Sequence, residues 1–251
     1  EATRALAALF HARFDPDLEA EREPALAGAA SALAAARVPI RSAAEDRVFG
    51  VLESLIRATL RTSFFAAASP ADPHELALKL DSRAIPGIPA PVPFCEIFVH
   101  SSEFIGIHLR GGKVARGGLR WSDRLQDLRT EILSLWKTQR VKNGLIVPVG
   151  AKGGFALARI ASDAPGARAE ADRIYPRFVA ALLRLTDDVR GERVIGPDRI
   201  VRHDGDDPYL VVAADKGTAH LSDVANRVAQ DAGFWLGDAF ASGGSNGYDH
   251  K

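Results

Sequence analysis

The sequence predicts an α/β protein in which a mixed sheet with flanking helices follows a helical segment. Three observations predict it. The opening residues are rich in alanine and leucine, a proline cluster then interrupts the chain, and beyond the cluster short β-branched runs alternate with helical patterns. With 251 residues, of which 47% are hydrophobic, the chain is long enough to bury a substantial core.

Helices are expected over residues 2–68, with breaks at Pro16, Pro24 and Pro39. Five apolar residues in this stretch recur at helical spacing and are expected to pack as one face: Val48, Leu52, Leu55, Ile56 and Leu60. Four prolines between residues 86 and 93 then restrict their predecessors to extended conformations. We therefore expect a helical segment over residues 1–85 and a second domain over residues 86–251.

The second domain opens with strand patterns at residues 95–99 and 104–109, which predict a hairpin across a polar turn. Ser122 is placed to cap a helix over residues 123–140, which carries acidic residues early and basic residues late. A buried strand at 145–147, a helix at 167–185, a strand at 209–212 and a helix at 222–230 are expected to follow. Strands that alternate with helices favour an α/β domain.

Composition excludes several classes of protein. The 32 basic and 32 acidic residues cancel, so no overall field recruits nucleic acid or an anionic membrane. Cys95 is the single cysteine, which rules out an internal disulfide and a cysteine metal cluster and favours a reducing compartment, the cytoplasm. No apolar run is long enough to span a bilayer. Because the chain starts at glutamate and lacks methionine, we expect it to be a fragment of a longer protein.

Lysine usage indicates where the chemistry lies. The chain has 25 arginines and 7 lysines, yet four of the lysines fall between Lys113 and Lys152. A lysine, unlike an arginine, can lose its proton when it is desolvated or crowded by other cations. Lys152 stands between glycines in residues 147–155, which read as a strand end and a tight turn. It is the candidate acid–base residue, and a merely solvated turn lysine is the alternative.

Two further segments are expected to reach the same place. If the helix over 123–140 packs beside the strand at 145–147, the residues before it and at its end face Lys152. Cations gathered there suit a dicarboxylate, because buried carboxylates need charge-assisted hydrogen bonds. Asp215, which follows the strand at 209–212, is the candidate carboxylate partner or else a turn or helix cap. The other candidates are Arg116, Gln139 and Lys142.

These motifs resemble the substrate-binding domain of glutamate dehydrogenases. The resemblance rests on residues 116–122, 142–148 and 150–154 and covers residues 92–251. Residues 121–124 and 204–209 are similar to the large NAD-specific bacterial class. The resemblance implies oxidative deamination of L-glutamate to 2-oxoglutarate and ammonia, with NAD as the cofactor and a homo-oligomeric enzyme.

The resemblance also implies roles for individual residues. Lys152 matches the family's catalytic lysine and Asp215 its proton-transferring aspartate. Lys142 matches the lysine that holds the α-carboxylate, with Gln139 assisting. Arg116 replaces the lysine that binds the γ-carboxylate ahead of the glycine pair; Lys113 is the alternative ligand. The glycine pair is Gly117 and Gly118.

The sequence lacks a strand followed by Gly-x-Gly-x-x-Gly and a helix, so the dinucleotide domain is expected elsewhere in the protein. The isolated chain is then expected to be inactive. Two alternatives stay open: a catalytically silent amino-acid-sensing or assembly module of the same fold, and an enzyme that uses Lys152 as an imine-forming nucleophile. Scattered histidines predict no metal site, and the acidic residues 204–207 are expected to form a solvated loop near the active site.

Overall fold

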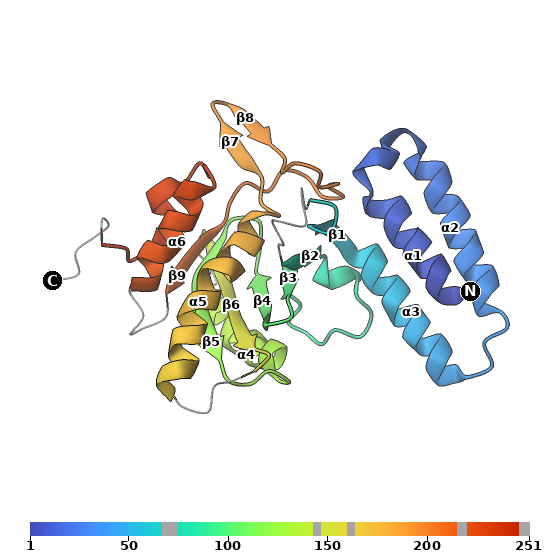
Figure 1. Cartoon of the computed structure of the whole chain (residues 1–251), viewed down its shortest axis with the longest axis horizontal. Helices are drawn as coiled ribbons and strands as arrows, with labels where there is room; N and C mark the ends of the chain where they lie inside the picture. Colours follow the sequence, from blue (N-terminus) through green and yellow to red (C-terminus); the bar gives the residue numbers. More distant parts are fainter. Residues whose placement is uncertain (67–74, 143–146, 160–163, 215–219, 246–251) are drawn as a thin grey trace.

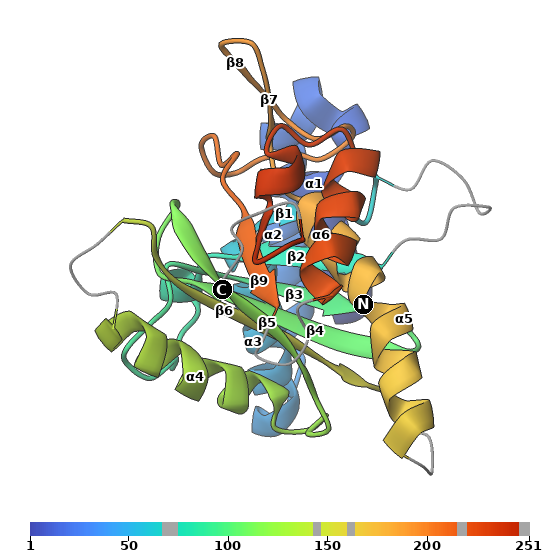
Figure 2. The same ribbon diagram turned by 90° about the vertical axis from the view of Figure 1, so that its left-hand side faces the viewer.

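A computed structural model describes residues 1–66, 75–142, 147–159, 164–214 and 220–245. The described chain forms an eight-stranded mixed sheet with helices on both faces and a group of helices at one end (Figures 1 and 2). This arrangement confirms the predicted α/β class with flanking helices. None of the described helices combines the length and the apolar character that a bilayer crossing requires.

The strand order is β1-β2-β3-β4-β6-β5-β9-β10. Neighbouring pairs from β1 to β6 are antiparallel, whereas β6, β5, β9 and β10 run parallel. Their bounds are β1 Thr59–Thr62, β2 Leu76–Leu80, β3 Cys95–His100, β4 Phe104–Arg110, β5 Ala115–Ser122, β6 Val149–Leu157, β9 Val211–Ala214 and β10 Ala241–Ser242. The predicted hairpin is confirmed as β3 and β4, and β7 (Asp188–Arg190) and β8 (Arg193–Ile195) form a separate hairpin.

Side chains alternate between the two faces of the sheet, so both faces present apolar residues, and helices cover both. Ile132 and Trp136 of α4 pack on one face, and α5 and α6 cover the other through residues such as Phe178 and Ala225 (Figure 2). The first three helices form their own small core around Leu9. The helix bounds are α1 Ala2–Phe14, α2 Arg22–Arg37, α3 Ala43–Ala58, α4 Leu128–Lys142, α5 Ala164–Leu183 and α6 His220–Asp231; 3-10 turns span Pro16–Glu21, Ser82–Ala84 and Gly237–Ala239.

The expectation of helices up to residue 68 was wrong for the described residues that follow Ala58. The chain enters β1 directly after α3, and β2 follows before residue 85. Residues 59–62 read Thr-Leu-Arg-Thr, and the two β-branched threonines suit a strand once neighbouring strands are present. The expected apolar face is also incomplete, since Val48 is 57% and Leu52 is 43% exposed. The division of the chain into two domains at residue 85 stays a prediction.

The glycine-rich residues around Lys152 form part of strand β6, so the expected turn was wrong. Glycine serves close packing here. A Cβ on Gly154 would lie 2.6 Å from Ile132 Cδ1, so α4 sits against a strip of sheet that has no side chain. Ser122 does not cap α4, which begins at Leu128; instead it ends β5, and its hydroxyl accepts from the Arg124 amide at 3.1 Å.

Candidate functional site

Arg116 and Lys152 lie on adjacent parallel strands. Arg116 of β5 is paired with Gly150 of β6, and further along Arg120 is paired with Gly154. Residues paired across neighbouring strands point to the same face, and so do residues two apart in one strand. Lys152 therefore shares a face with Arg116. Arg116 is exposed and Lys152 is half-buried.

The glycine pair lets β5 and β6 approach closely at this row. A Cβ on Gly117 would overlap the carbonyl oxygen of Ala151, the residue before Lys152. Only glycine fits there without a shift of one backbone. Gly117 therefore serves the close approach of the two backbones, whereas Gly118, two residues from Arg116, leaves the face shared with Lys152 without a side chain at its position.

Helix α4 covers the same face. The Trp136 indole donates a hydrogen bond to the Gly150 carbonyl at 3.1 Å, so the second half of the helix lies over the start of β6. Gln139 is three residues further along, on the same side of the helix as Trp136, and is half-buried. Lys142 is the last residue of α4, and the position of its side chain lies outside the described structure.

Asp215 lies outside the described residues. Strand β9, which leads to it, ends at Ala214, and Ala214 is paired with Leu119 of β5. The strand predicted at residues 209–212 is therefore found, shifted by two residues. The structure brings Arg116, Gly118 and Lys152 to one face with Gln139 nearby, whereas Gly117 belongs to the opposite face of β5, and the predicted roles of all these residues stay predictions.

Lys113 differs from Arg116 in its surroundings. The Lys113 ammonium donates to the carbonyl oxygen of Asp206 at 3.1 Å, whereas the Arg116 guanidinium has no hydrogen-bond or ion-pair partner among the described residues. An arginine offers a planar fork that matches a carboxylate. This contrast favours Arg116 over Lys113 as the carboxylate ligand.

A buried network of charges lies beside this site, and sequence reasoning missed it. Arg61 and Lys79 bind Asp204, Lys79 and Arg110 bind Asp207, and Arg61 also binds Asp187. The expected solvated acidic loop was therefore wrong for Asp207, which is 3% exposed, whereas Gly205 and Asp206 are exposed as expected. The signal was a single charged residue inside otherwise apolar strands, such as Lys79 between Leu78 and Leu80.

Arg110 contributes to a lowered pKa of the Asp207 carboxyl group. Burial alone would raise the pKa of Asp207, but the charges and hydrogen bonds of Arg110 and Lys79 outweigh burial and lower the pKa to about 2. Asp207 is therefore ionised at neutral pH. Buried charges of opposite sign then balance across the network, which is the condition for keeping them out of water.

His108 of β4 is wholly buried, and neither ring nitrogen has a hydrogen-bond partner within the described residues. Burial lowers the pKa of His108 to about 3, with a smaller contribution from Arg110. The unfolded imidazole, with an ordinary pKa near ~6.5, takes up a proton in a range where the folded one does not. The stability that His108 contributes is therefore present above pH ~6.5 and is lost as the pH falls toward 3.

Between pH 7 and pH 5, His108 is expected to lower the unfolding free energy of the wild-type protein by about 2 kcal/mol. We expect this decrease to be absent in His108→Leu, because leucine takes up no proton in either state. Urea unfolding at the two pH values measures it. His100→Gln changes an exposed histidine and is the matched control. Equal pH dependence in wild type and His108→Leu would contradict a neutral buried imidazole.

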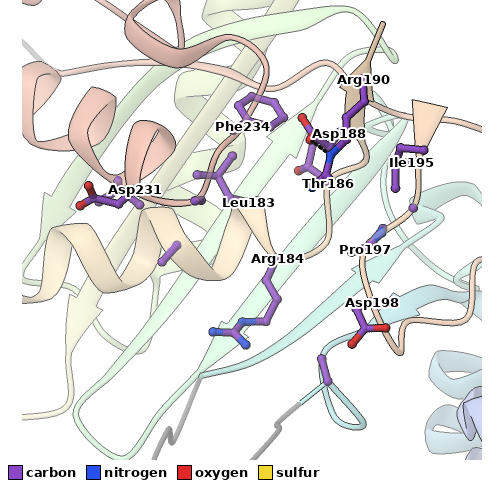
Figure 3. A pocket seen from close by; sticks show the side chains of 15 residues that line it. Leu183, Arg184, Thr186, Asp188, Arg190, Ile195, Pro197, Asp198, Asp231 and Phe234 are labelled. Atoms are coloured by element: carbon purple, nitrogen blue, oxygen red, sulfur yellow. Dashed lines mark hydrogen bonds and ion pairs between the residues drawn. The ribbon is translucent and has the colours of Figure 1, made fainter. Parts of the chain in front are cut away.

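The cavity in Figure 3 is separate from this site. It has a volume of about 820 Å³ and lies among the end of α5, the β7–β8 hairpin and the end of α6. None of the predicted site residues lines it. Its Asp188 is already engaged, accepting from Arg190 at 3.2 Å and from the Trp235 amide at 2.9 Å. Within the described residues, no group of three His, Cys, Asp or Glu side chains is placed to hold a metal ion.

Comparison with known proteins gives a consistent result. The family model for the catalytic domain of bacterial NAD-glutamate dehydrogenase matches residues 33–251. The NAD-specific glutamate dehydrogenase of Halomonas elongata is 50% identical over 254 residues, which is all of this chain and 16% of that protein. The proteins of the same name from Pseudomonas aeruginosa and Mycobacterium tuberculosis are 55% identical over 82% of the chain and 51% identical over 99% of it.

The chain spans only 13% to 16% of the length of these curated relatives. Among solved structures, the glutamate dehydrogenase of Peptoniphilus asaccharolyticus aligns with 59% of this chain and 32% of its own. The identity is 17% and the TM-score is 0.37.

Proposed function

The chain belongs to the bacterial NAD-glutamate dehydrogenase family, and from this we infer that it supplies the amino-acid site of an oxidoreductase. The proposed reaction is the NAD-dependent oxidative deamination of L-glutamate to 2-oxoglutarate and ammonia. One observation carries the proposal. Arg116 and Lys152 share a face of the sheet across a row of glycines, beneath the helix that bears Gln139.

Arg116 is proposed to bind the γ-carboxylate of glutamate. Its exposed guanidinium offers two parallel N–H donors to the two carboxylate oxygens. Lys142 and Gln139 are proposed to hold the α-carboxylate at the other end of the substrate. Fixing both ends turns the α-hydrogen in one direction, so orientation itself lowers the barrier to its transfer.

Lys152 and Asp215 are proposed to carry the proton chemistry. The neutral Lys152 amine takes a proton from the attacking water, and the ammonium group so formed polarises the developing carbonyl oxygen, while Asp215 moves protons to and from the substrate nitrogen. Gly118 has no side chain on the face that Arg116 and Lys152 share, so the substrate carbon is proposed to approach the Lys152 amino group there. Both roles rest on the match to the family's motifs and on the position of Lys152 in β6.

NAD supplies the hydride acceptor in this proposal. The residues of this chain do not fit a dinucleotide. No stretch of the sequence joins a strand to a helix through Gly-x-Gly-x-x-Gly, and the tight glycine approaches in the described sheet serve helix and strand packing. The cofactor is therefore proposed to bind mainly to a part of the protein outside these 251 residues.

The compartment, the oligomeric state and the small-molecule partners of the enzyme are also part of the proposal. A single buried, unpaired cysteine suits the cytoplasm. The family resemblance implies a homo-oligomer. L-glutamate and 2-oxoglutarate are the proposed small-molecule partners.

The test concerns the proposal that this chain binds the amino acid while another part of the protein binds NAD. The full-length protein is expected to reduce NAD when glutamate is added, followed by absorbance at the NADH band. The isolated 251-residue chain is expected to bind 2-oxoglutarate in calorimetry but to produce no NADH. NAD reduction by the isolated chain would refute the division, and a full-length protein that binds 2-oxoglutarate without turnover would favour the silent sensing module.

A further inference from the structure

Arg110, the last residue of β4, ties together the starts of two other strands. Its side chain is 2% exposed. One guanidinium nitrogen, Nη2, shares its two N–H groups among three acceptors: the carbonyl oxygen of Tyr209 at 3.0 Å, that of Lys113, and the Asp207 carboxylate. Tyr209 stands two residues before β9, and Lys113 stands two residues before β5. A single buried side chain thus holds the backbone at the entrance of both strands.

Asp207 holds this arginine in place. Its two carboxylate oxygens accept from Arg110 Nη1 at 2.6 Å and Nη2 at 2.9 Å, and Lys79 adds a bond of 2.6 Å. The Asp207 amide in turn donates to Asp187 at 2.7 Å. Both oxygens and the backbone of Asp207 are therefore fixed, which leaves the Arg110 fork one orientation.

The two anchored strands carry the proposed amino-acid site. β5 and β9 are neighbours, paired from Arg116 and Val211 to Leu119 and Ala214. Arg116 to Gly118 lie on β5, and β9 leads to Asp215. A slip of one strand along the other would move Arg116 relative to the end of β9. Catalysis is sensitive to such shifts, since a misplacement of about 1 Å can cost about 100-fold in rate.

We propose that Arg110 and Asp207 are positioning residues of the amino-acid site: the pair sets the register of β5 against β9 and so aligns Arg116 with the end of β9. The inference rests on the proposed function. Neither residue needs to touch the substrate, because the effect passes through the carbonyl groups of Lys113 and Tyr209.

The test uses the full-length protein and the near-isosteric variant Asp207→Asn, which leaves Arg110 and Lys79 without their shared charge. We expect kcat/KM for glutamate to fall by about 100-fold with the KM for NAD unchanged. Asp204→Asn is the matched control: it lies in the same loop and binds Lys79 and Arg61, but the described structure gives it no bond to β5, β9 or Arg110. It is expected to lower stability and to keep kcat/KM near the wild-type value.

Two more readouts separate positioning from loss of structure. Arg110→Lys keeps the charge but lacks the fork, so it is expected to reproduce the effect of Asp207→Asn. The double variant Asp207→Asn, Arg116→Ala is expected to lower kcat/KM by less than the product of the two single decreases. In Asp207→Asn, Arg116 is already misplaced, so removing its side chain has a smaller effect. Equal losses in Asp207→Asn and Asp204→Asn, or full additivity, would overturn the proposal.

Amide hydrogen exchange tests the positioning role without a measurement of glutamate oxidation. Amides of residues 115–119 and 211–214 are expected to exchange faster in Asp207→Asn than in Asp204→Asn. Unchanged exchange in both strands would overturn the positioning role even in an active enzyme. A wild-type protein that does not oxidise glutamate, with the exchange difference present, would instead count against the proposed function alone.

Discussion

Replacing Lys152 with alanine in the full-length protein is expected to lower kcat for glutamate oxidation by about 10³-fold. The proposed site depends on one ammonium group beside the reacting carbon, and the neighbouring glycines offer no side chain to replace it. Lys152 is half-buried and lies outside the apolar clusters of the described core, so the fold is expected to survive the change. Steady-state NADH formation and circular dichroism measure the two effects.

Lys137→Ala is the matched control, since Lys137 is a half-buried lysine on α4 that the proposed mechanism does not use. It is expected to leave kcat unchanged. Lys152→Arg keeps a positive charge but cannot give up a proton, so it separates electrostatic from acid–base roles. Preserved turnover in Lys152→Ala would exclude the mechanism, and borohydride trapping of Lys152 with 2-oxoglutarate would favour an imine-forming enzyme instead.

The parts of the fold that depend on local pattern could be predicted from the sequence. The hairpin of β3 and β4, helix α5 and strand β9 follow from alternation or helical spacing within a few residues. The glycines around Lys152 could not be assigned in this way. A turn and a tightly packed strand both need glycine, and only the presence of Ile132 above Gly154 distinguishes them.

The buried charged residues could not be predicted from the sequence, because their partners are distant in the chain. Arg61 meets Asp204 across 143 positions of sequence, and Arg110 meets Asp207 across 97. A charged residue read alone is expected to face water, and only its distant partner makes burial tolerable. For the site, the sequence placed Arg116 and Lys152 on segments that do meet on one face. Lys142 and Asp215 remain predictions from motif matches.

Arg61→Met is expected to lower the unfolding free energy of the chain by about 3–5 kcal/mol, because it removes the buried partner of Asp187 and one of the two cationic partners of Asp204. The Arg61 side chain is fully buried and binds Asp187 at 2.6 and 3.1 Å and Asp204 at 2.6 Å. It also donates to the carbonyls of Leu185 and Gly205, each at 3.1 Å. Urea unfolding at pH 7 measures the loss from the shift in midpoint at constant slope.

Arg83→Met tests whether burial is the cause. Arg83 binds Asp81 through two bonds of 2.9 and 3.1 Å, so its pairing geometry is similar, but its side chain is 60% exposed. An exposed pair contributes about 0–1 kcal/mol, and the control should lose no more than that. Adding Asp187→Asn to Arg61→Met removes one of the stranded charges and should recover part of the loss. Equal losses for the buried and exposed arginines would mean that the network does not depend on charge balance in the interior.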